Sequence, residues 1–350
     1  MFDRRATRAS EHLRVEHLEV TFGRGTRRVV RDVSFDVPPG EAFGLAGESG
    51  SGKSMTLRSI LGLLPPGAKA TGSIHYGDRS LLELAPREYQ RLRGSTVGMV
   101  FQDPMTALNP VLRVRDSIAQ VVQAHDRADG GSARRRAVEL MERVGIRDAA
   151  RRSLAYPHQF SGGMRQRVVI AMALAARPSL LLADEPTTAL DVVVQGEILR
   201  TLDRLRREDG MTLLLVSHDF GVIAGLCNRV GVMYAGELVE LGPTERVLFE
   251  PSHPYTVGLI NSLPEAGWGR GARLRPIPGS QPEAGEAIVG SAFAPRCPLA
   301  TDECRAAAIP LAPAGPDHLS RCIHVDRIGE LRTAGSPEGV GWGEMVAGHG

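Results

Sequence analysis

The chain has 350 residues, of which 42% are hydrophobic and 23% are charged, as in ordinary globular proteins. The length allows one large domain with an extension, or two domains. A net charge of +2 gives no indication of nucleic-acid binding by itself. No apolar run approaches the roughly 18 residues of a membrane-spanning helix, and residues 1–8 are too charged for a secretory signal. We therefore expect a cytoplasmic protein. If it acts at a membrane, something else must hold it there.

The first half of the chain predicts strands followed by a glycine-rich loop and a helix. Residues 13–22 and 29–37 alternate between apolar and polar side chains, which predicts two strands. Residues 42–46 form a short apolar strand, and residues 53–64 read as a helix that ends at Pro65. The loop between the last two elements is thus flanked by a strand and a helix, the context that a phosphate-binding loop requires.

Residues 47–54, called here the phosphate loop, fit the pattern G-x-x-x-x-G-K-[ST]. Glycines let backbone N–H groups approach phosphate oxygens, and the following helix presents its positive end. Lys53, one of only two lysines in the chain, can reach the β- and γ-phosphates, and Ser54 can bind Mg²⁺. A glycine turn that matches by chance is disfavoured by the flanking strand and helix. The predicted nucleotide contacts are Gly47, Glu48, Ser49, Gly50, Ser51, Gly52, Lys53 and Ser54.

A second apolar strand, residues 180–183, ends in the carboxylates Asp184 and Glu185. Ligands of open parallel sheets bind at the carboxyl ends of strands. Asp184 is therefore predicted to hold Mg²⁺, and Glu185 to orient or deprotonate the attacking water. On its own, a solvated acidic turn before Pro186 would be the better interpretation. The phosphate loop reverses that preference.

The surrounding elements predict an α/β fold with a parallel sheet. Helices at 162–176 and 192–208 alternate with the apolar strands at 180–183 and 212–216. A more polar, helical stretch rich in Arg and Ala separates them from the phosphate loop and predicts a distinct helical lobe.

A third feature narrows the class of nucleotide-binding protein. Ser161, Gly162 and Gly163, called here the signature turn, open the helix at 162–176. A serine N-cap alone would explain a helix start, but a Ser-Gly-Gly turn is also a second anion site. Together with the phosphate loop, it resembles the signature motif of ABC ATPases, although residues 164–166 stand where many members have a single Gln. The resemblance implies that each nucleotide lies between the phosphate loop of one subunit and the signature of another.

Other positions resemble the ABC family in the right order along the chain. Gln102 matches the Q-loop glutamine, which contacts Mg²⁺ and water and signals to the membrane domain. Asp191 matches the D-loop, and His218 matches the switch histidine at the γ-phosphate. Phe22 matches the aromatic that stacks on adenine, although aromatics at this place are often core residues. The resemblance implies that Glu185, His218 and Lys53 serve catalysis, and that Ser54, Gln102 and Asp184 serve Mg²⁺.

The resemblance extends to the dipeptide/oligopeptide importer branch. Residues 100–110, 160–167 and 251–256 follow that branch, and residues 294–322 resemble its C-terminal extension. Nickel and opine importers share much of this pattern. The implied fold is a P-loop NTPase of ABC type with a RecA-like core, a helical subdomain at about 103–165 and a small loop-rich extension. The expected boundaries are a disordered tail at 1–10, an ATPase domain at 11–264, the extension at 265–328 and a second disordered tail at 329–350.

Three of the four cysteines fall in the predicted extension. Cys227 lies in the ATPase domain and reads as a buried small apolar residue. The resemblance implies that four extension cysteines can hold a [4Fe–4S] cluster, and Cys297, Cys304 and Cys322 match three of them. Ser291 stands at the first position, where serine is a poor iron ligand, so absence of a stable cluster is slightly favoured. A cluster with a foreign fourth ligand, free thiols, and a Zn²⁺ site completed by His318 or His324 stay open.

The expected function is ATP binding and hydrolysis that power an ABC importer for dipeptides or oligopeptides, with a nickel or opine importer as the alternative. With one set of motifs and no membrane span, the chain would need a second ATPase subunit, two permeases and an extracytoplasmic substrate-binding protein. The second ATPase would be a related but different chain, or a second copy of this one. The expected place is the cytoplasmic face of the membrane, without nucleic acid. A soluble ABC protein acting on ribosomes or DNA is disfavoured, because it would carry two motif sets, long coiled coils or zinc modules.

Overall fold

The computed structural model describes residues 11–333 except Arg24, Thr26, Arg127, Ala189, 263–276 and Ala284. The tail predicted at 1–10 and most of the one predicted at 329–350 therefore lie outside the described residues. The second prediction is wrong at its start, because helix α14 (Ile328–Thr333) runs through Thr333 and buries Ile328. No helix among the described ranges is both long enough and apolar enough to span a membrane.

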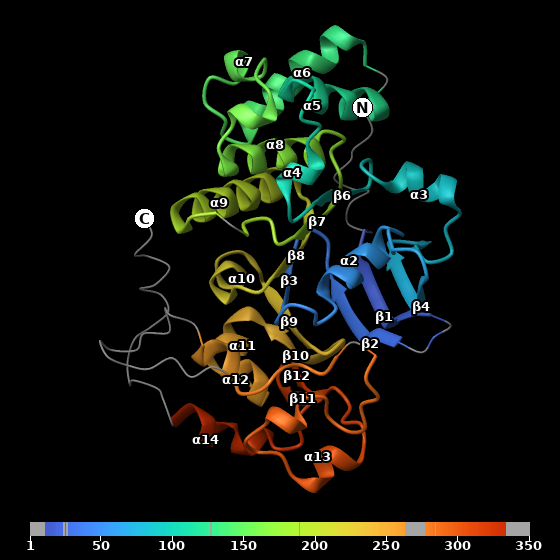
Figure 1. Cartoon of the computed structure of the whole chain (residues 1–350), viewed down its shortest axis with the longest axis vertical. Helices are drawn as coiled ribbons and strands as arrows, with labels where there is room; N and C mark the ends of the chain where they lie inside the picture. Colours follow the sequence, from blue (N-terminus) through green and yellow to red (C-terminus); the bar gives the residue numbers. More distant parts are fainter. Residues whose placement is uncertain are drawn as a thin grey trace.

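An eight-stranded sheet forms the centre of the molecule, with the strand order β11-β12-β10-β9-β3-β8-β7-β6 (Figure 1). The five strands from β9 to β6 are parallel to one another, and β9 pairs with β10 in the antiparallel direction. Every residue of β3, β7 and β8 is buried, which explains their continuous apolar sequences, since parallel sheets are covered on both faces. The bounds are β3 (Ala42–Ala46), β6 (Val97–Val100), β7 (Leu180–Asp184), β8 (Thr212–Ser217), β9 (Arg229–Tyr234), β10 (Glu237–Pro243), β11 (Ala312–Gly315) and β12 (His318–Ser320).

A second, antiparallel sheet has the strand order β2-β1-β4-β5. Helix α2 (Lys53–Ile60) lies beside it in Figure 1, and its Leu57 shares one apolar cluster with Val20 of the small sheet and Leu45 of the large sheet. The helix that follows the phosphate loop is thus wedged between two sheets. The strands are β1 (Leu13–Phe22), β2 (Arg27–Val37), β4 (Ala68–Tyr76) and β5 (Arg79–Ser80).

The stretch predicted as a helical lobe is helical and lies at one end of the molecule (Figure 1). Its apolar residues, such as Ile118, Leu140 and Ile170, join the main core. The elements are α4 (Pro104–Ala107), α5 (Val114–Asp126), α6 (Gly130–Arg143), α7 (Ala149–Arg152), η1 (Pro157–Gln159) and α8 (Gly162–Leu174). Outside the lobe lie α3 (Pro86–Leu92), α9 (Val192–Asp209) and α10 (Phe220–Leu226).

The C-terminal segment lies at the end of the molecule opposite the helical lobe (Figure 1) and is joined to the core by the main sheet. Strand β12 pairs with β10, so the C-terminal segment continues the main sheet. The elements are β10 (Glu237–Pro243), α11 (Thr244–Phe249), α12 (Pro254–Asn261), η2 (Ala294–Arg296), α13 (Asp302–Ala306), β11 (Ala312–Gly315), β12 (His318–Ser320) and η3 (Val325–Arg327).

A buried polar pair reinforces this junction. His318 Nε2 lies 2.7 Å from Glu240 Oε1, and the two side chains are 3% and 0% exposed. The same Glu240 oxygen accepts the backbone N–H of Ser252 at 2.6 Å. Glu240 Oε2 has no hydrogen-bond partner among the described residues. If His318 is removed, the Glu240 carboxylate therefore has few other hydrogen-bond partners to compensate for the loss.

We expect His318→Ala to lower the free energy of unfolding by about 3–5 kcal/mol, because it leaves a buried carboxylate without its partner. The matched control is His17→Ala, which removes a histidine that bonds Asp32 on the surface and is 82% exposed. That change should leave the free energy of unfolding close to the parental value, because exposed ion pairs contribute little. Denaturant unfolding of the two variants checks the prediction, and equal losses would contradict it.

Candidate nucleotide-binding site

The phosphate loop connects the buried end of β3 to the start of α2. Gly47 has φ of +143°, and a Cβ there would lie 2.2 Å from the Met233 carbonyl oxygen. Gly52 has φ of +104°, and a Cβ there would lie 2.8 Å from the Val29 carbonyl oxygen. Both positions therefore require glycine, for conformation and for space. The close approach of neighbouring backbone fixes where the loop can lie.

The Lys53 ammonium group is buried inside the loop. Its Nζ donates to the carbonyl oxygens of Gly47 at 2.7 Å and Glu48 at 2.8 Å, and to Ser51 Oγ at 3.2 Å. Burial lowers the pKa of Lys53, while the carboxylates of Glu185, Asp184 and Glu48 act in the opposite direction. An ammonium with oxygen acceptors already around it is positioned to take phosphate oxygens in their place.

Ser54 and Asp184 are two of the three residues that the sequence assigned to Mg²⁺, and the third, Gln102, bonds Glu185 nearby. Ser54 Oγ donates to Asp184 Oδ1 at 2.8 Å. Burial raises the pKa of Asp184, the hydrogen bond from Ser54 lowers it, and the negative charge of Glu185 raises it again. Hydroxyl and carboxylate oxygens are the ligands that Mg²⁺ prefers, and a divalent cation would neutralise the two adjacent carboxylates. The residues present therefore fit the ion.

Three polar groups meet at one oxygen of Glu185. Gln102 Nε2 donates to Glu185 Oε2 at 3.2 Å, Thr188 Oγ1 donates to it at 2.8 Å, and His218 Nδ1 lies 3.2 Å away. Gln102, Glu185 and His218 follow the ends of β6, β7 and β8, which are adjacent parallel strands. Strand order in the sheet thus brings together residues that are up to 116 positions apart in the sequence.

Sequence reasoning missed Thr188 and the partners of Glu48. Thr188 closes a turn on Glu185, since its backbone N–H donates to the Glu185 carbonyl oxygen at 3.3 Å. A threonine three residues after the carboxylate was a local signal for this turn. The Glu48 carboxylate is bonded to Gln281 and Arg296. No local signal could indicate partners more than 230 residues away.

The signature turn and the predicted D-loop lie next to each other at the starts of α8 and α9. Ser161 Oγ caps α8 by accepting the N–H of Met164 at 3.3 Å. Asp191 Oδ1 caps α9 by accepting the N–H of Val194 at 3.0 Å. A Cβ on Gly163 would lie 2.4 Å from Val194 Cγ1, so glycine lets these two helix starts pack closely.

Within one chain the signature turn lies on the helical lobe, whereas the phosphate loop lies at α2 beside the small sheet (Figure 1). The other predicted site residues do come together within one chain. They meet at the strand ends and are Lys53, Ser54, Asp184, Glu185, Gln102 and His218.

Phe22 is half-buried at the end of β1, and its contact with adenine stays a prediction.

The extension cysteines lie in one region but form no described metal site. His324 N–H donates to Cys322 Sγ at 3.4 Å, and Thr301 Oγ1 lies 3.1 Å from His324 Nε2 and 3.5 Å from Cys304 Sγ. Ser291 N–H donates to the Cys304 carbonyl oxygen at 2.8 Å, so the backbone of Ser291 lies beside Cys304. In the described ranges, no group of three or more His, Cys, Asp and Glu side chains is arranged to hold a metal ion.

The contacts of His318 and Cys227 bear on two of the interpretations made from the sequence. His318 is bonded to Glu240 in the junction with β10, which removes it from the zinc alternative. Cys227 is buried in the main core, where burial raises the pKa of its thiol, as expected of a small apolar residue.

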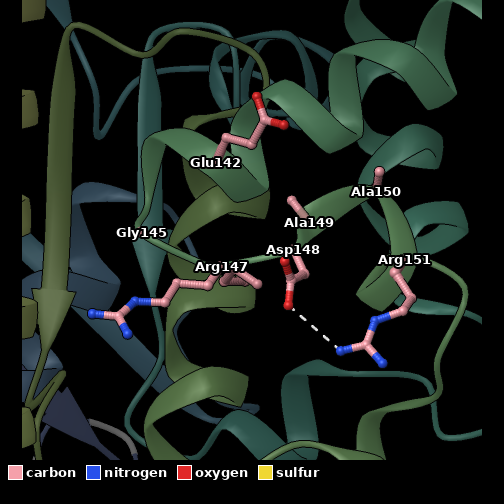
Figure 2. Close-up of a pocket in the computed structure, with 8 residues that line it drawn as sticks. Glu142, Gly145, Arg147, Asp148, Ala149, Ala150 and Arg151 are labelled. Carbon is pink, nitrogen blue, oxygen red and sulfur yellow. Dashed lines mark hydrogen bonds and ion pairs between the residues drawn. The ribbon is translucent and has the colours of Figure 1, made fainter.

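A separate hollow of about 750 Å³ lies on the helical lobe. It is lined by Glu142 and residues 145–151, and Figure 2 shows Arg147 and Arg151 there, with Arg151 3.5 Å from Asp148. It contains none of the residues that the sequence assigned to nucleotide. The hollow is therefore separate from the predicted nucleotide site.

Comparison with known proteins agrees with this geometry. Residues 30–188 match the family model described as ABC transporter, and residues 239–304 match the one described as oligopeptide/dipeptide transporter, C-terminal region. The chain is 46% identical over 290 residues to the dipeptide transport ATP-binding protein DppD of Bacillus subtilis, covering 82% of this chain and 86% of that protein. The chain belongs to the ABC transporter family. Its ABC ATPase fold and ATP hydrolysis follow from this membership.

Two further relatives support the assignment. The oligopeptide transport ATP-binding protein OppD of Salmonella typhimurium is 43% identical over 313 residues, covering 89% of this chain and 93% of OppD. A solved ATP-binding cassette, a dimer in a post-hydrolysis state with ADP and Pi, superimposes with a TM-score of 0.59 at 30% identity. The superposition covers 66% of this chain and 98% of the cassette, so the remaining third of this chain includes parts that the cassette lacks.

We expect Lys53→Ala to weaken MgATP binding by at least about tenfold, because it removes the buried cation that faces the phosphates. Fluorescent-nucleotide titration of the purified chain checks this. Lys69→Ala is the matched control, since Lys69 lies in β4 of the small sheet. Near-parental affinity of the Lys53 variant would show that the loop is not the nucleotide site.

Proposed function

We propose that the chain is the ATP-hydrolysing subunit of an ABC importer for dipeptides or oligopeptides. The observation that carries the substrate class is the C-terminal match at 239–304, together with relatives at 43–46% identity that are named for dipeptide and oligopeptide transport. The part that the match covers includes β10, with which strand β12 of the extension pairs. The extension is therefore an integral part of the subunit.

The chemistry follows from the residues at the strand ends. Lys53 and the first turn of α2 neutralise the phosphate charge, since the N–H groups of a first helical turn lack partners within the helix. Ser54 and Asp184 supply oxygen ligands to Mg²⁺, which offsets the charge that develops in phosphoryl transfer. Glu185 accepts a proton from water, while Gln102 and His218 hold its carboxylate and report the state of the phosphates.

The signature turn lies at the start of α8 on the helical lobe, whereas the phosphate loop precedes α2 beside the small sheet, and this separation supports a site shared between two ATPase subunits. The serine and glycine N–H groups at the start of α8 would bind the nucleotide of the facing subunit. We propose a related but different chain as that subunit, with two membrane permeases and an extracytoplasmic binding protein. The chain would then lie at the cytoplasmic face of the membrane.

Glu185→Gln should bind MgATP with an affinity near that of the parent, and we expect kcat to fall by about 10²–10⁴ because the general base is lost while the shape is kept. The hydrogen bonds from Gln102 and Thr188 can still reach the amide oxygen. Steady-state ATPase assays and nucleotide titration separate the two effects. A parental kcat would show that another group activates water.

Transport specificity is tested with the assembled transporter in proteoliposomes. We expect ATPase activity to be stimulated by binding protein loaded with dipeptides or oligopeptides. Stimulation only by Ni²⁺-loaded or opine-loaded binding protein would show that the substrate is nickel or an opine. The ATPase assignment would be unaffected. Recovery of the chain only with ribosomes or DNA, never with permeases, would overturn the transporter assignment.

We also infer that the three extension cysteines hold no stable [4Fe–4S] cluster, because serine stands at position 291, where the family resemblance implies the fourth cysteine. Anaerobically purified protein should contain less than about one iron per chain, since four thiolates are the usual ligand set. Ser291→Cys, which restores the fourth thiol, should raise iron and sulfide together. A stoichiometric cluster in the parent would overturn the inference.

A further inference from the structure

Glu48, the second residue of the phosphate loop, is tied to the C-terminal part of the chain through both backbone and side chain. Its N–H donates to Tyr255 Oη at 2.9 Å. Its carboxylate accepts Gln281 Nε2 at 2.6 Å and two guanidinium nitrogens of Arg296 at 3.0 and 3.3 Å. Three residues that lie more than 200 positions away thus determine where Glu48 lies.

Arg296 is itself held in one orientation. Its guanidinium group donates to the carbonyl oxygens of Pro278 at 2.7 Å and Ile277 at 3.3 Å, and to Tyr234 Oη at 3.3 Å. Its side chain is 7% exposed and lies 5.7 Å from the centre of the Tyr234 ring. A planar, fixed fork of this kind recognises a carboxylate in a defined geometry, which lysine cannot reproduce.

An aromatic cluster fixes the same junction. Tyr234, Tyr255 and Phe293 pack against one another with ring centres 4.7 to 5.3 Å apart. Tyr234 ends strand β9, directly after Met233, whose carbonyl oxygen approaches Gly47. Residues of the core and of the extension therefore lie next to each other where they contact the phosphate loop.

The contacts continue from Glu48 to the catalytic lysine. Lys53 Nζ bonds the Glu48 carbonyl oxygen at 2.8 Å, so the residue that Arg296 holds is also an acceptor for the ammonium group. We propose that Arg296, supported by Gln281, is a positioning residue through which the C-terminal extension sets the affinity of the phosphate loop for MgATP. The inference rests on the proposed role of the loop in binding MgATP.

The expected effect is on binding and not on the chemical step. Without Arg296, the Glu48 carboxylate would keep the hydrogen bond from Gln281 but would lose its cationic partner, which leaves an uncompensated negative charge in the phosphate loop. The groups proposed to act on water, Glu185, Gln102 and His218, contact one another at other strand ends. Arg296→Ala should therefore raise the KM for ATP and leave kcat nearly unchanged.

The test measures KM, kcat and MgATP affinity for the full chain in the assembled transporter. We expect Arg296→Ala to raise KM and Kd about tenfold, as for loss of a partner in a hydrogen-bonded charge pair, with kcat within about twofold. Arg296→Lys should recover part of the loss, since it restores charge without the fork. The matched control is Arg327→Ala, which removes an extension arginine that bonds Glu330 three residues away and should leave KM at the parental value.

A double-mutant cycle tests whether Arg296 acts through Glu48. Glu48→Gln combined with Arg296→Ala should bind MgATP better than Arg296→Ala alone, because no uncompensated negative charge is left. If Arg296→Ala fails to fold, Gln281→Ala serves as the second variant, with a threefold to fivefold rise in KM expected from loss of one charge-assisted hydrogen bond.

Parental KM in both Arg296→Ala and Gln281→Ala would overturn the inference, as would a rise in KM that Arg327→Ala reproduces or strict additivity in the cycle. Lys53→Ala separates this failure from failure of the proposed site. If Lys53→Ala abolishes binding while Arg296→Ala does not change it, only the positioning role is wrong. If neither variant changes binding, the loop is not the nucleotide site.

Discussion

A buried ammonium group holds the phosphate loop in shape, and the rest of the site is arranged around it. Lys53 satisfies its three donors with two loop carbonyl oxygens and a serine hydroxyl, which a buried cation requires. The same need for acceptors makes the group ready for phosphate oxygens. Glycine at positions 47 and 52 is the steric condition for this arrangement, because neighbouring carbonyl oxygens occupy the space of a Cβ.

The parallel sheet supplies the second half of the site. Adjacent strands β6, β7 and β8 deliver Gln102, Glu185 and His218 to one edge, and Asp184 closes the gap to Ser54. The family's chemistry can then be placed on named side chains. The antiparallel addition of β12 to β10 attaches the extension to the same sheet, and Arg296 brings it to the loop. The predicted catalytic residues and the extension are therefore attached to the same sheet.

The sequence predicted the parallel elements well, because continuous apolar strands and capped helices are local signals. The strand predicted at 180–183 is β7 (Leu180–Asp184), and the helix at 192–208 is α9 (Val192–Asp209). The pairing of β12 with β10 and the contacts of Glu48 could not be predicted, since they join residues far apart without a periodic pattern. The tail predicted from 329 was misjudged because a short helix with one buried Ile leaves little trace in composition. The domain boundaries and the individual site roles stay predictions.

The central claim is that this chain provides the phosphate loop of a nucleotide site that another ATPase subunit completes. A structure of the assembled transporter carrying Glu185→Gln, determined with MgATP, tests it most directly. The account predicts the triphosphate against Lys53 and Ser54, with the signature turn of the facing subunit on its other side. Ser161, Gly162 and Gly163 of this chain should contact the nucleotide held by that subunit. A nucleotide bound within one chain, away from the phosphate loop or without a signature turn beside it, would contradict the account.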